Sequence, residues 1–449
     1  MKNRGCSFFD DTFYTDIIKL NNEKGGVYVM SKDLNQKICI VGGGPSGISA
    51  AWYLQEKGYK DVTVLERLDR LGGKCNSPVY DGKHYEMGAI MGVPNYDETI
   101  KLMKVAGVEA DGPKLDRKFY SERTGEEIMG ISKEEMPEVK AQVEKLGQLL
   151  ATKYKGYTDP GYLNVHPDMT ETFYDFCMMN EVPLCMKIWI NPYTAYGYGY
   201  FNLVPAAYVF KYLDFETMMH FVKKELITWA DGTQTVWEKL ALKLNRHPRM
   251  CTKIDKVVRK DDKVYVYTNM GKEEYDTIIF TSPLQDLHLY ADTTEEEEHL
   301  FSKIKYEDYK VLAATVENYP EISGYIPGNM FESRAGHVMV YYDRWVNNPE
   351  QIITFYVLGN PQEKVDEADC KRLILEDAKL FGMNIKDVVM YKSWRYFPHV
   401  NSDELKNGWY NKVEGMQGER NTYYAGEVMS FGNIEESVCY SKFVVDRFF

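Results

Sequence analysis

The sequence has few of the groupings that bind metals or form disulfide frameworks. Its eight cysteines are scattered over 449 residues without a C-x-x-C pair, and its eight histidines include no H-x-x-x-H pair. Both a zinc site and a disulfide scaffold need more regular spacings, so neither is expected. Unpaired cysteines are typical of a reducing compartment, which predicts a cytoplasmic protein. The cysteines are Cys6, Cys39, Cys75, Cys177, Cys185, Cys251, Cys370 and Cys439.

Basic charge and long apolar runs are also scarce. The chain has 54 Lys and Arg against 67 Asp and Glu, which gives a net charge of −13. Nucleic-acid binding depends on basic side chains that neutralise phosphates, so no nucleic-acid partner is expected. The same balance argues against electrostatic docking on anionic lipid. No apolar run approaches the ~18 residues of a transmembrane helix. No signal peptide is expected, because no apolar segment follows the opening MKNRG.

The first 36 residues are expected to be peripheral to the fold. They show neither helical nor strand periodicity, and the first clear strand begins directly after them. Two interpretations stay open. Met30 is the true start of the protein, or the segment is a genuine flexible extension.

A dinucleotide-binding unit is predicted after this segment. Residues 37–41 (KICIV) have the pattern of a buried strand, and residues 61–65 (DVTVL) have that of a second strand. Between them lies a helix that ends at Gly58, a residue suited to a C-terminal cap. The glycines of a G-x-G-x-x-G motif separate the first strand from the helix; they are Gly42, Gly44 and Gly47.

Each residue of this motif has a physical task in a dinucleotide site. Gly42 permits a tight turn, Gly44 lets the backbone approach a pyrophosphate, and Gly47 allows close helix–strand packing. Pro45 suits the first helical turn, and the helix N-terminus favours phosphate charge. Glu66, which ends the second strand 19 residues after Gly47, can accept hydrogen bonds from a ribose. This context predicts a bound dinucleotide.

Two further motifs indicate which dinucleotide. Gly72-Gly73-Lys74 follows Glu66, and Tyr424-Ala425-Gly426-Glu427 precedes a C-terminal helix. With the glycine motif they resemble the flavin-containing amine oxidoreductase superfamily, in which an R-x-G-G-R-like loop covers the pyrophosphate and an acidic residue contacts the ribityl–phosphate region. Lys74 stands where arginine is usual, so its contact is a point charge instead of a fork. The resemblance implies non-covalent FAD.

The rest of the chain completes the expected fold. Residues 134–219 are mostly helical in pattern, and residues 189–221 hold eleven aromatic side chains. The acidic run 295–298 is expected in a solvated loop or helix end. Strand patterns at VLAATVE, HVMVYYDRW, IITFYVLG and VVMYKSWRYF indicate an antiparallel sheet.

The predicted fold class is α/β. It comprises a Rossmann-like FAD-binding domain of the amine oxidoreductase type, a helical domain and an antiparallel-sheet substrate domain. The FAD-binding domain is expected at residues 37–113, 229–283 and 405–449, the helical domain that lines a tunnel at 114–228, and the substrate domain at 284–404.

A narrower resemblance is to the bacterial polyunsaturated fatty acid double-bond isomerases, and it runs from about Lys37 to Phe449. In that family a bent apolar tunnel leads a fatty acid to FAD, and an arginine and a phenylalanine hold the carboxylate at the tunnel mouth. The stretches that carry the resemblance are His84–Glu98, Asp111–Phe119, Leu146–Tyr157, Trp189–Gly199, Val204–Phe221, Trp229–Gln234, Gly336–Tyr342 and Lys412–Asn433.

This resemblance implies the site residues and the reaction. It assigns substrate binding to Arg117 and Phe221, and Tyr196 stands where the family can have phenylalanine. A hydride leaves the bis-allylic carbon of a free polyunsaturated fatty acid such as linoleic acid and returns to one end of the diene system. No side chain acts as catalyst, since the flavin carries the hydride. The implied cofactor residues are Gly42, Gly44, Pro45, Ser46, Gly47, Glu66, Arg67, Gly73, Lys74, Ala89, Ile90, Met91, Val257, Glu427, Asn433 and Ile434.

Two other functions stay open. A soluble amine oxidase of the same superfamily also needs an aromatic site beside its flavin, and it differs in producing hydrogen peroxide from amines. A partner- or lipid-binding protein on this fold differs in having lost the flavin. The sequence leaves the oligomeric state and the product isomer undetermined.

Overall fold

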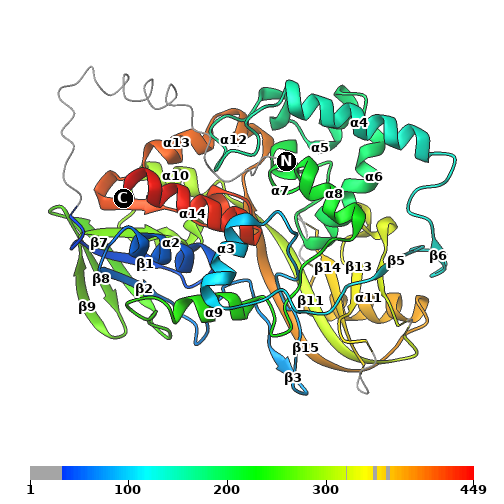
Figure 1. The fold of residues 1–449 in the computed structure, drawn as a ribbon, viewed down its shortest axis with the longest axis horizontal. Helices are drawn as coiled ribbons and strands as arrows, with labels where there is room; N and C mark the ends of the chain where they lie inside the picture. The colour runs from blue at the N-terminus through cyan, green and yellow to red at the C-terminus, as the bar shows by residue number, and fades with distance from the viewer. Residues whose placement is uncertain (1–32, 320, 347–350, 361–364) are drawn as a thin grey trace.

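The fold has two lobes that meet at a central layer of helices (Figure 1). It is known from a computed structural model, which describes residues 33–319, 321–346, 351–360 and 365–449. The alternative start considered at Met30 therefore lies outside the described residues. Leu34 and Gln36 do contact the fold: the Leu34 carbonyl accepts from the Lys60 N–H at 3.3 Å, and Gln36 accepts from the Thr277 hydroxyl at 3.2 Å.

The first lobe is built on a parallel four-stranded sheet in the order β16-β10-β1-β2. The predicted strand 37–41 is β1, and its last four residues are buried. Proline at the first helical position starts α2, which ends two residues before Gly58. Helices α2 and α14 pack together beside the sheet. The elements are β1 (Lys37–Val41), α2 (Pro45–Glu56), β2 (Asp61–Leu65), β10 (Thr277–Phe280), β16 (Thr422–Tyr424) and α14 (Ile434–Phe448).

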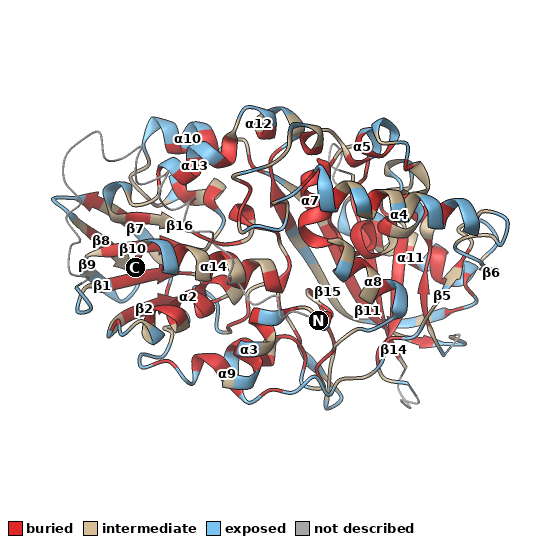
Figure 2. Cartoon of the chain, turned by 45° about the horizontal axis from the view of Figure 1, so that its top comes forward, coloured by how far each residue is buried: buried red, intermediate tan, exposed pale blue. Residues whose placement is uncertain are grey.

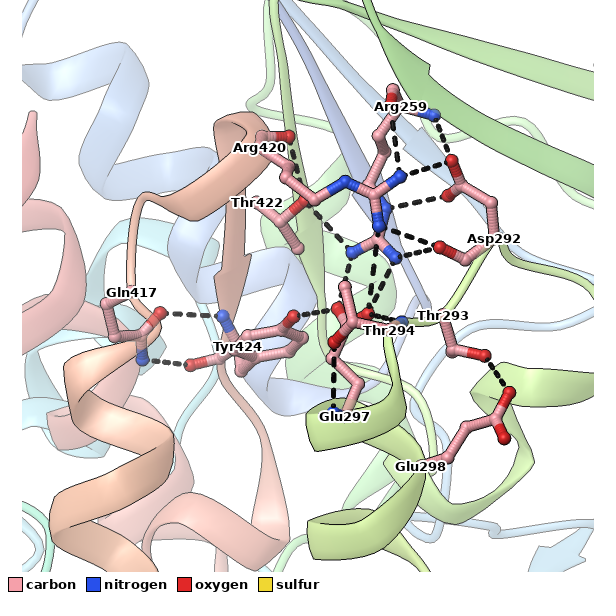
Figure 3. A network of polar contacts seen from close by, with 10 residues as sticks. All are labelled: Arg259, Asp292, Thr293, Thr294, Glu297, Glu298, Gln417, Arg420, Thr422 and Tyr424. Atoms are coloured by element: carbon pink, nitrogen blue, oxygen red, sulfur yellow. Dashed lines mark hydrogen bonds and ion pairs between the residues drawn. The ribbon is translucent and has the colours of Figure 1, made fainter.

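An antiparallel meander flanks this sheet and is held to it by buried charges. It comprises β7 (Ile254–Lys260), β8 (Lys263–Thr268) and β9 (Gly271–Tyr275). Arg259 on β7 donates to Glu297 at 2.6 and 2.9 Å and to Asp292 at 2.9 Å (Figure 3). The Tyr424 hydroxyl of β16 donates to the same Glu297. These contacts join the meander, the first turn of a helix and the parallel sheet.

The acidic run 295–298 is thus only partly as expected. It forms the first turn of α10 (Glu295–Phe301), where Thr294 and Glu297 make a capping box. Glu297, however, is buried and paired with Arg259, because one acidic side chain of the run faces inward from the helix.

The second lobe is a seven-stranded sheet in the order β15-β11-β14-β13-β12-β5-β6. The four predicted antiparallel strands are its β11, β13, β14 and β15. Two short strands from the region expected to be mainly helical, β5 and β6, extend its edge, and β5 pairs parallel with β12. The strands are β5 (Arg117–Tyr120), β6 (Glu127–Ile128), β11 (Lys305–Glu317), β12 (Ser323–Tyr325), β13 (Val338–Asp343), β14 (Ile352–Leu358) and β15 (Asn384–His399).

Helices fill the space between and around the lobes, and the buried residues concentrate in the strands and the inward faces of these helices (Figure 2). The aromatic-rich stretch 189–221 lies within this layer, and ten of its eleven aromatic residues are buried. The remaining helices and the small hairpin are β3 (Val79–Tyr80), β4 (Lys83–His84), α3 (Asp97–Ala106), α4 (Met136–Thr152), α5 (Phe173–Met179), α6 (Met186–Tyr193), α7 (Ala206–Tyr212), α8 (Phe215–Lys223), α9 (Gln234–Ala241), α11 (Glu367–Leu380), α12 (Ser402–Lys406) and α13 (Trp409–Gly415).

Two features are absent from the described part of the chain. None of its helices is long and apolar enough to cross a membrane. Within the same residues no group of three or more His, Cys, Asp or Glu side chains is placed to hold a metal ion.

Candidate functional site

The glycine motif forms a tight loop between β1 and α2. Gly42 has a φ of 112°, and its N–H donates to the Leu65 carbonyl at 2.9 Å. A Cβ on Gly47 would lie 1.9 Å from the Gly42 carbonyl oxygen, so this helix residue has no room for a side chain. A Cβ on Gly44 would meet nothing closer than 3.6 Å, the Cα of Gly73. Gly44 therefore has room for a methyl group, which would lie in van der Waals contact with the double-glycine loop.

Glu66 pins this loop from the end of β2. One of its carboxylate oxygens accepts from the Gly43 N–H at 2.7 Å, and the other accepts from the Leu68 N–H at 2.8 Å. Each oxygen keeps a second lone pair for a ligand. Pro45 and Ser46 form the first turn of α2, where backbone N–H groups have no partner within the helix.

Two arginines of the loop after β2, Arg67 and Arg70, differ in exposure and in their contacts. The predicted cofactor residue Arg67 is exposed. Arg70, which the sequence analysis did not single out, donates to the carbonyls of Leu71, Gly73 and Cys75 at 2.9–3.3 Å. The sequence could have indicated Arg70, because it is the first residue of the R-x-G-G-R-like loop, two positions before the double glycine. Arg70 thus fixes the shape of the double-glycine loop, and the Gly72 N–H, which donates to the Gly43 carbonyl at 2.9 Å, holds that loop against the glycine motif.

The two distant predicted motifs meet in space. Lys74, after the double glycine, forms an ion pair with Glu427, which lies 353 residues later. The Lys74 Nζ atom also lies 5.0 Å from the ring centroid of Tyr396. Gly426 has a φ of 112° and a Cβ there would approach the Thr281 carbonyl oxygen at 2.8 Å, so the turn before Glu427 requires glycine.

A cavity lies beside these motifs and collects several predicted residues. Ala89, Ile90, Met91, Asn433 and Ile434, all predicted to bind cofactor, line it together with the predicted substrate residue Tyr196. None of the described residues that line it carries a formal charge. The remaining lining residues are Gly88, Tyr96, Tyr198, Tyr212, Tyr309, Tyr396 and Gly432.

The N-terminus of α14 opens on this cavity. The Asn433 side-chain oxygen accepts from the Glu436 N–H at 2.7 Å and caps the helix. The helix is 15 residues long, so its dipole places partial positive charge at Asn433 and Ile434. This end of the cavity therefore favours negative charge on a ligand.

A buried carboxylate fixes the cavity wall at Ala89. Glu86 accepts from the Ser77 hydroxyl at 2.6 Å and from the Thr233 N–H at 2.9 Å, and Arg344 lies 3.5 Å away. The Thr233 hydroxyl in turn donates to the Ala89 carbonyl at 3.1 Å. Burial raises the pKa of the Glu86 carboxyl. No spacing in the sequence pointed to this group, since its members come from four separate segments.

Tyr196 belongs to a cluster of three tyrosine hydroxyls at one side of the cavity. Its hydroxyl bonds to that of Tyr342 at 2.9 Å and to that of Tyr325, and the latter two also bond to each other. All three side chains are buried. Burial raises the pKa of Tyr196 and Tyr342 well above the ordinary value, so these hydroxyls remain protonated and neutral.

Arg117 and Phe221, predicted from the narrower resemblance, lie next to this cluster. The Arg117 Nη2 donates to the Phe221 carbonyl at 2.6 Å, and the guanidinium carbon lies 5.4 Å from the Tyr325 ring centroid. The Phe221 ring is 6.1 Å from that of Tyr196. The Arg117 Nη1 is buried and has no hydrogen-bond partner among the described residues. Lys118, by contrast, is bonded to Glu127 at 2.6 Å on the surface.

Val257 does not join the predicted cofactor group around the cavity. Its side chain is fully buried in the meander. Its N–H donates to the Tyr290 carbonyl at 2.7 Å, and its carbonyl accepts from the Asp292 N–H at 3.2 Å. Both backbone groups are thus used by the fold, and the assignment of Val257 to the cofactor stays a prediction.

Comparisons with known proteins agree with this geometry. A family profile described as flavin containing amine oxidoreductase matches residues 45–427. The solved structure of the CLA-producing fatty acid isomerase from P. acnes is 48% identical, covers 93% of this chain and 100% of its own, and superimposes with a TM-score of 0.92. An uncharacterized protein of Acanthamoeba polyphaga mimivirus is 24% identical over 87% of this chain and 89% of its own. The polyenoic fatty acid isomerase of Ptilota filicina is 33% identical over 18% of this chain and 16% of its own.

Proposed function

Because this chain belongs to the flavin-containing amine oxidoreductase family, we propose that it is an FAD-dependent isomerase that converts free polyunsaturated fatty acids such as linoleic acid to conjugated isomers. The observation that carries the proposal is the 48% identity to a fatty acid isomerase over almost the whole chain. The charge-free, tyrosine-lined cavity beside Arg117 supports it, since an aliphatic acid needs apolar walls and one cation.

The described residues fit a flavin dinucleotide. Gly44 and Gly73 present two backbone loops without side chains in front of the α2 N-terminus, the kind of cradle that a pyrophosphate occupies. Glu66 would hold a ribose, Lys74 and Glu427 the phosphate–ribityl region, and Ala89–Met91 and Asn433–Ile434 the ring end. No described cysteine lines the cavity, which supports non-covalent binding. When bound, the flavin supplies a hydride acceptor and donor.

The protein's own contribution in this proposal is position and environment. Arg117 holds the substrate carboxylate, and Phe221, Tyr196 and the other aromatic rings guide the chain. In the described conformation the cavity has a volume of about 40 Å³, which is room for only a few water molecules. The rings must therefore move apart to admit an aliphatic chain, and that chain then displaces water from the site. In such a dry site, the N-terminus of α14 stabilises negative charge strongly.

An amine oxidase is the rival function, and the site argues against it. The tyrosine rings of the cavity would suit a cationic amine as well. The neighbouring Arg117 guanidinium, whose Nη1 has no partner among the described residues, would repel a cation and attract an acid.

The test is incubation of the purified protein with linoleic acid under nitrogen, followed by chromatography of the product. We expect conjugated isomers without NADH, NADPH or oxygen. A matched incubation with putrescine and other amines in air should give no hydrogen peroxide. Peroxide from amines together with unchanged linoleic acid would establish the rival function.

A further inference from the structure

The register of the second-lobe sheet decides which side chains approach Arg117. In the pairing, Arg117 is opposite Ser323, and Tyr325 is opposite Phe119 and Val340. Because side chains alternate along a strand, Arg117, Tyr325 and Tyr342 lie on one face of the sheet. Tyr341 lies on the opposite face, where it packs in a separate core cluster. One face of three neighbouring strands thus presents a cation and two phenols.

The hydrogen-bond capacity of this group is not used up. Each tyrosine hydroxyl has one donor and two acceptor lone pairs. The three hydroxyls of Tyr196, Tyr325 and Tyr342 bond to one another, and a hydroxyl can rotate toward a stronger acceptor. The buried Arg117 Nη1 has no partner among the described residues, although an unsatisfied buried charged donor is costly. The site is therefore built for an acceptor that the chain itself does not provide.

Nearby carboxylates of the chain do not meet this need. Asp116 is largely exposed and lies 3.8 Å from Lys224, and Glu127 is bonded to Lys118 on the surface. A guanidinium N–H binds an ionised acceptor more strongly than a neutral one, and the two oxygens of a carboxylate can accept from an N–H and an O–H together.

We propose that Tyr325 completes the carboxylate site: one oxygen of the fatty acid carboxylate binds Arg117 Nη1 and the other accepts from the Tyr325 hydroxyl, which Tyr196 and Tyr342 orient. This inference rests on the proposed function, since it names a further residue that binds the same substrate. It makes Tyr325 a specificity-determining residue for free acids over their esters and alcohols.

The experiment measures binding of palmitic acid and of hexadecanol to the flavin-loaded protein by isothermal titration calorimetry. Neither ligand has a bis-allylic carbon, so neither can react. Tyr325→Phe should weaken binding of the acid about ten- to a hundredfold, the range for one hydrogen bond to a charged group, and should change binding of the alcohol less than about twofold. Tyr342→Phe should weaken acid binding in the same direction by a smaller factor.

Tyr341→Phe is the matched control. It removes a phenol from the neighbouring position on β13 that faces the other side of the sheet, and the selectivity for acid over alcohol should not change. Equal losses for acid and alcohol in Tyr325→Phe, or unchanged acid binding, would overturn the inference and leave the cluster a packing feature. If Tyr325→Phe does not fold, Tyr342→Phe decides by the same ratio. A wild-type protein that binds palmitic acid selectively but leaves linoleic acid unchanged would refute the proposed function alone.

Discussion

Alanine at two glycines of the same motif, Gly44 and Gly47, should impair the protein for different reasons. At Gly44 the added Cβ meets no protein atom within 3.6 Å, and the backbone there is at φ −81°, which alanine readily adopts. At Gly47 the Cβ would lie 1.9 Å from the Gly42 carbonyl oxygen. Ordinary contacts of this kind are about 3.5 Å, so the loop must move by more than an ångström.

The expected magnitudes follow from these distances. Gly44→Ala should leave the stability of the flavin-free protein nearly unchanged and lower flavin affinity strongly, because the methyl group takes the space of the pyrophosphate. Gly47→Ala should lower both, with a loss of folding free energy of about 1–3 kcal/mol, as is usual for overpacking. The ligand-binding role of Gly44 and the packing role of Gly47 can thus be separated by adding one methyl group at each position.

The assay compares the flavin absorbance of each purified variant with the thermal unfolding midpoint of its flavin-free form. A Gly44→Ala protein that keeps full flavin content would refute the assignment of this loop to the pyrophosphate. A Gly47→Ala protein as stable as the wild type would show that the contact between α2 and the Gly42 turn is looser than described.

Three further predictions concern substrate binding, the pH dependence of stability and the fate of the transferred hydrogen. Arg117→Ala should weaken binding of free linoleic acid by about 1.5–3 kcal/mol, Arg117→Lys should restore only part of it, and the methyl ester should be insensitive to both changes, as measured by KM. Burial, with Asp308 and Glu332 nearby, raises the pKa of Glu307 to about 8, so the protonated form stabilises the fold at low pH. That stabilisation is lost as the pH rises from about 4.5 to about 8. The free energy of unfolding of the wild type should therefore fall by about 3 kcal/mol between pH 6 and pH 9. Glu307→Gln should abolish this fall, as measured by thermal or denaturant unfolding at each pH. Linoleic acid deuterated at its bis-allylic carbon should keep the label in the conjugated product, and full exchange with solvent would instead indicate a side-chain base.

Local features of the fold could be predicted because neighbouring residues determine them. The strand at 37–41, the glycine turn and the helix start at Pro45 need only the sequence of one βαβ unit. Non-local features could not be predicted. Strands β5 and β6 lie in the domain 114–228, which was expected to be mainly helical, and they form because they pair with the edge of a distant sheet. Likewise, the burial of Glu297 depends on Arg259, 38 residues away.

The residues of the candidate site also fall into two groups: those in local motifs could be predicted, and those brought together by distant strands could not. The residues predicted to hold the flavin lie in short motifs, and Ala89–Met91, Asn433 and Ile434 do line one cavity. The hydroxyl cluster joins Tyr196 to Tyr325 and Tyr342 across 129 and 146 residues, a separation that no spacing rule reveals. Arg117 itself was identified by resemblance alone, and only the sheet register shows that it shares a face with two tyrosines. Relatives that keep the local motifs can therefore bind flavin and still differ in substrate, because the groups that choose the substrate come from pairings between distant strands.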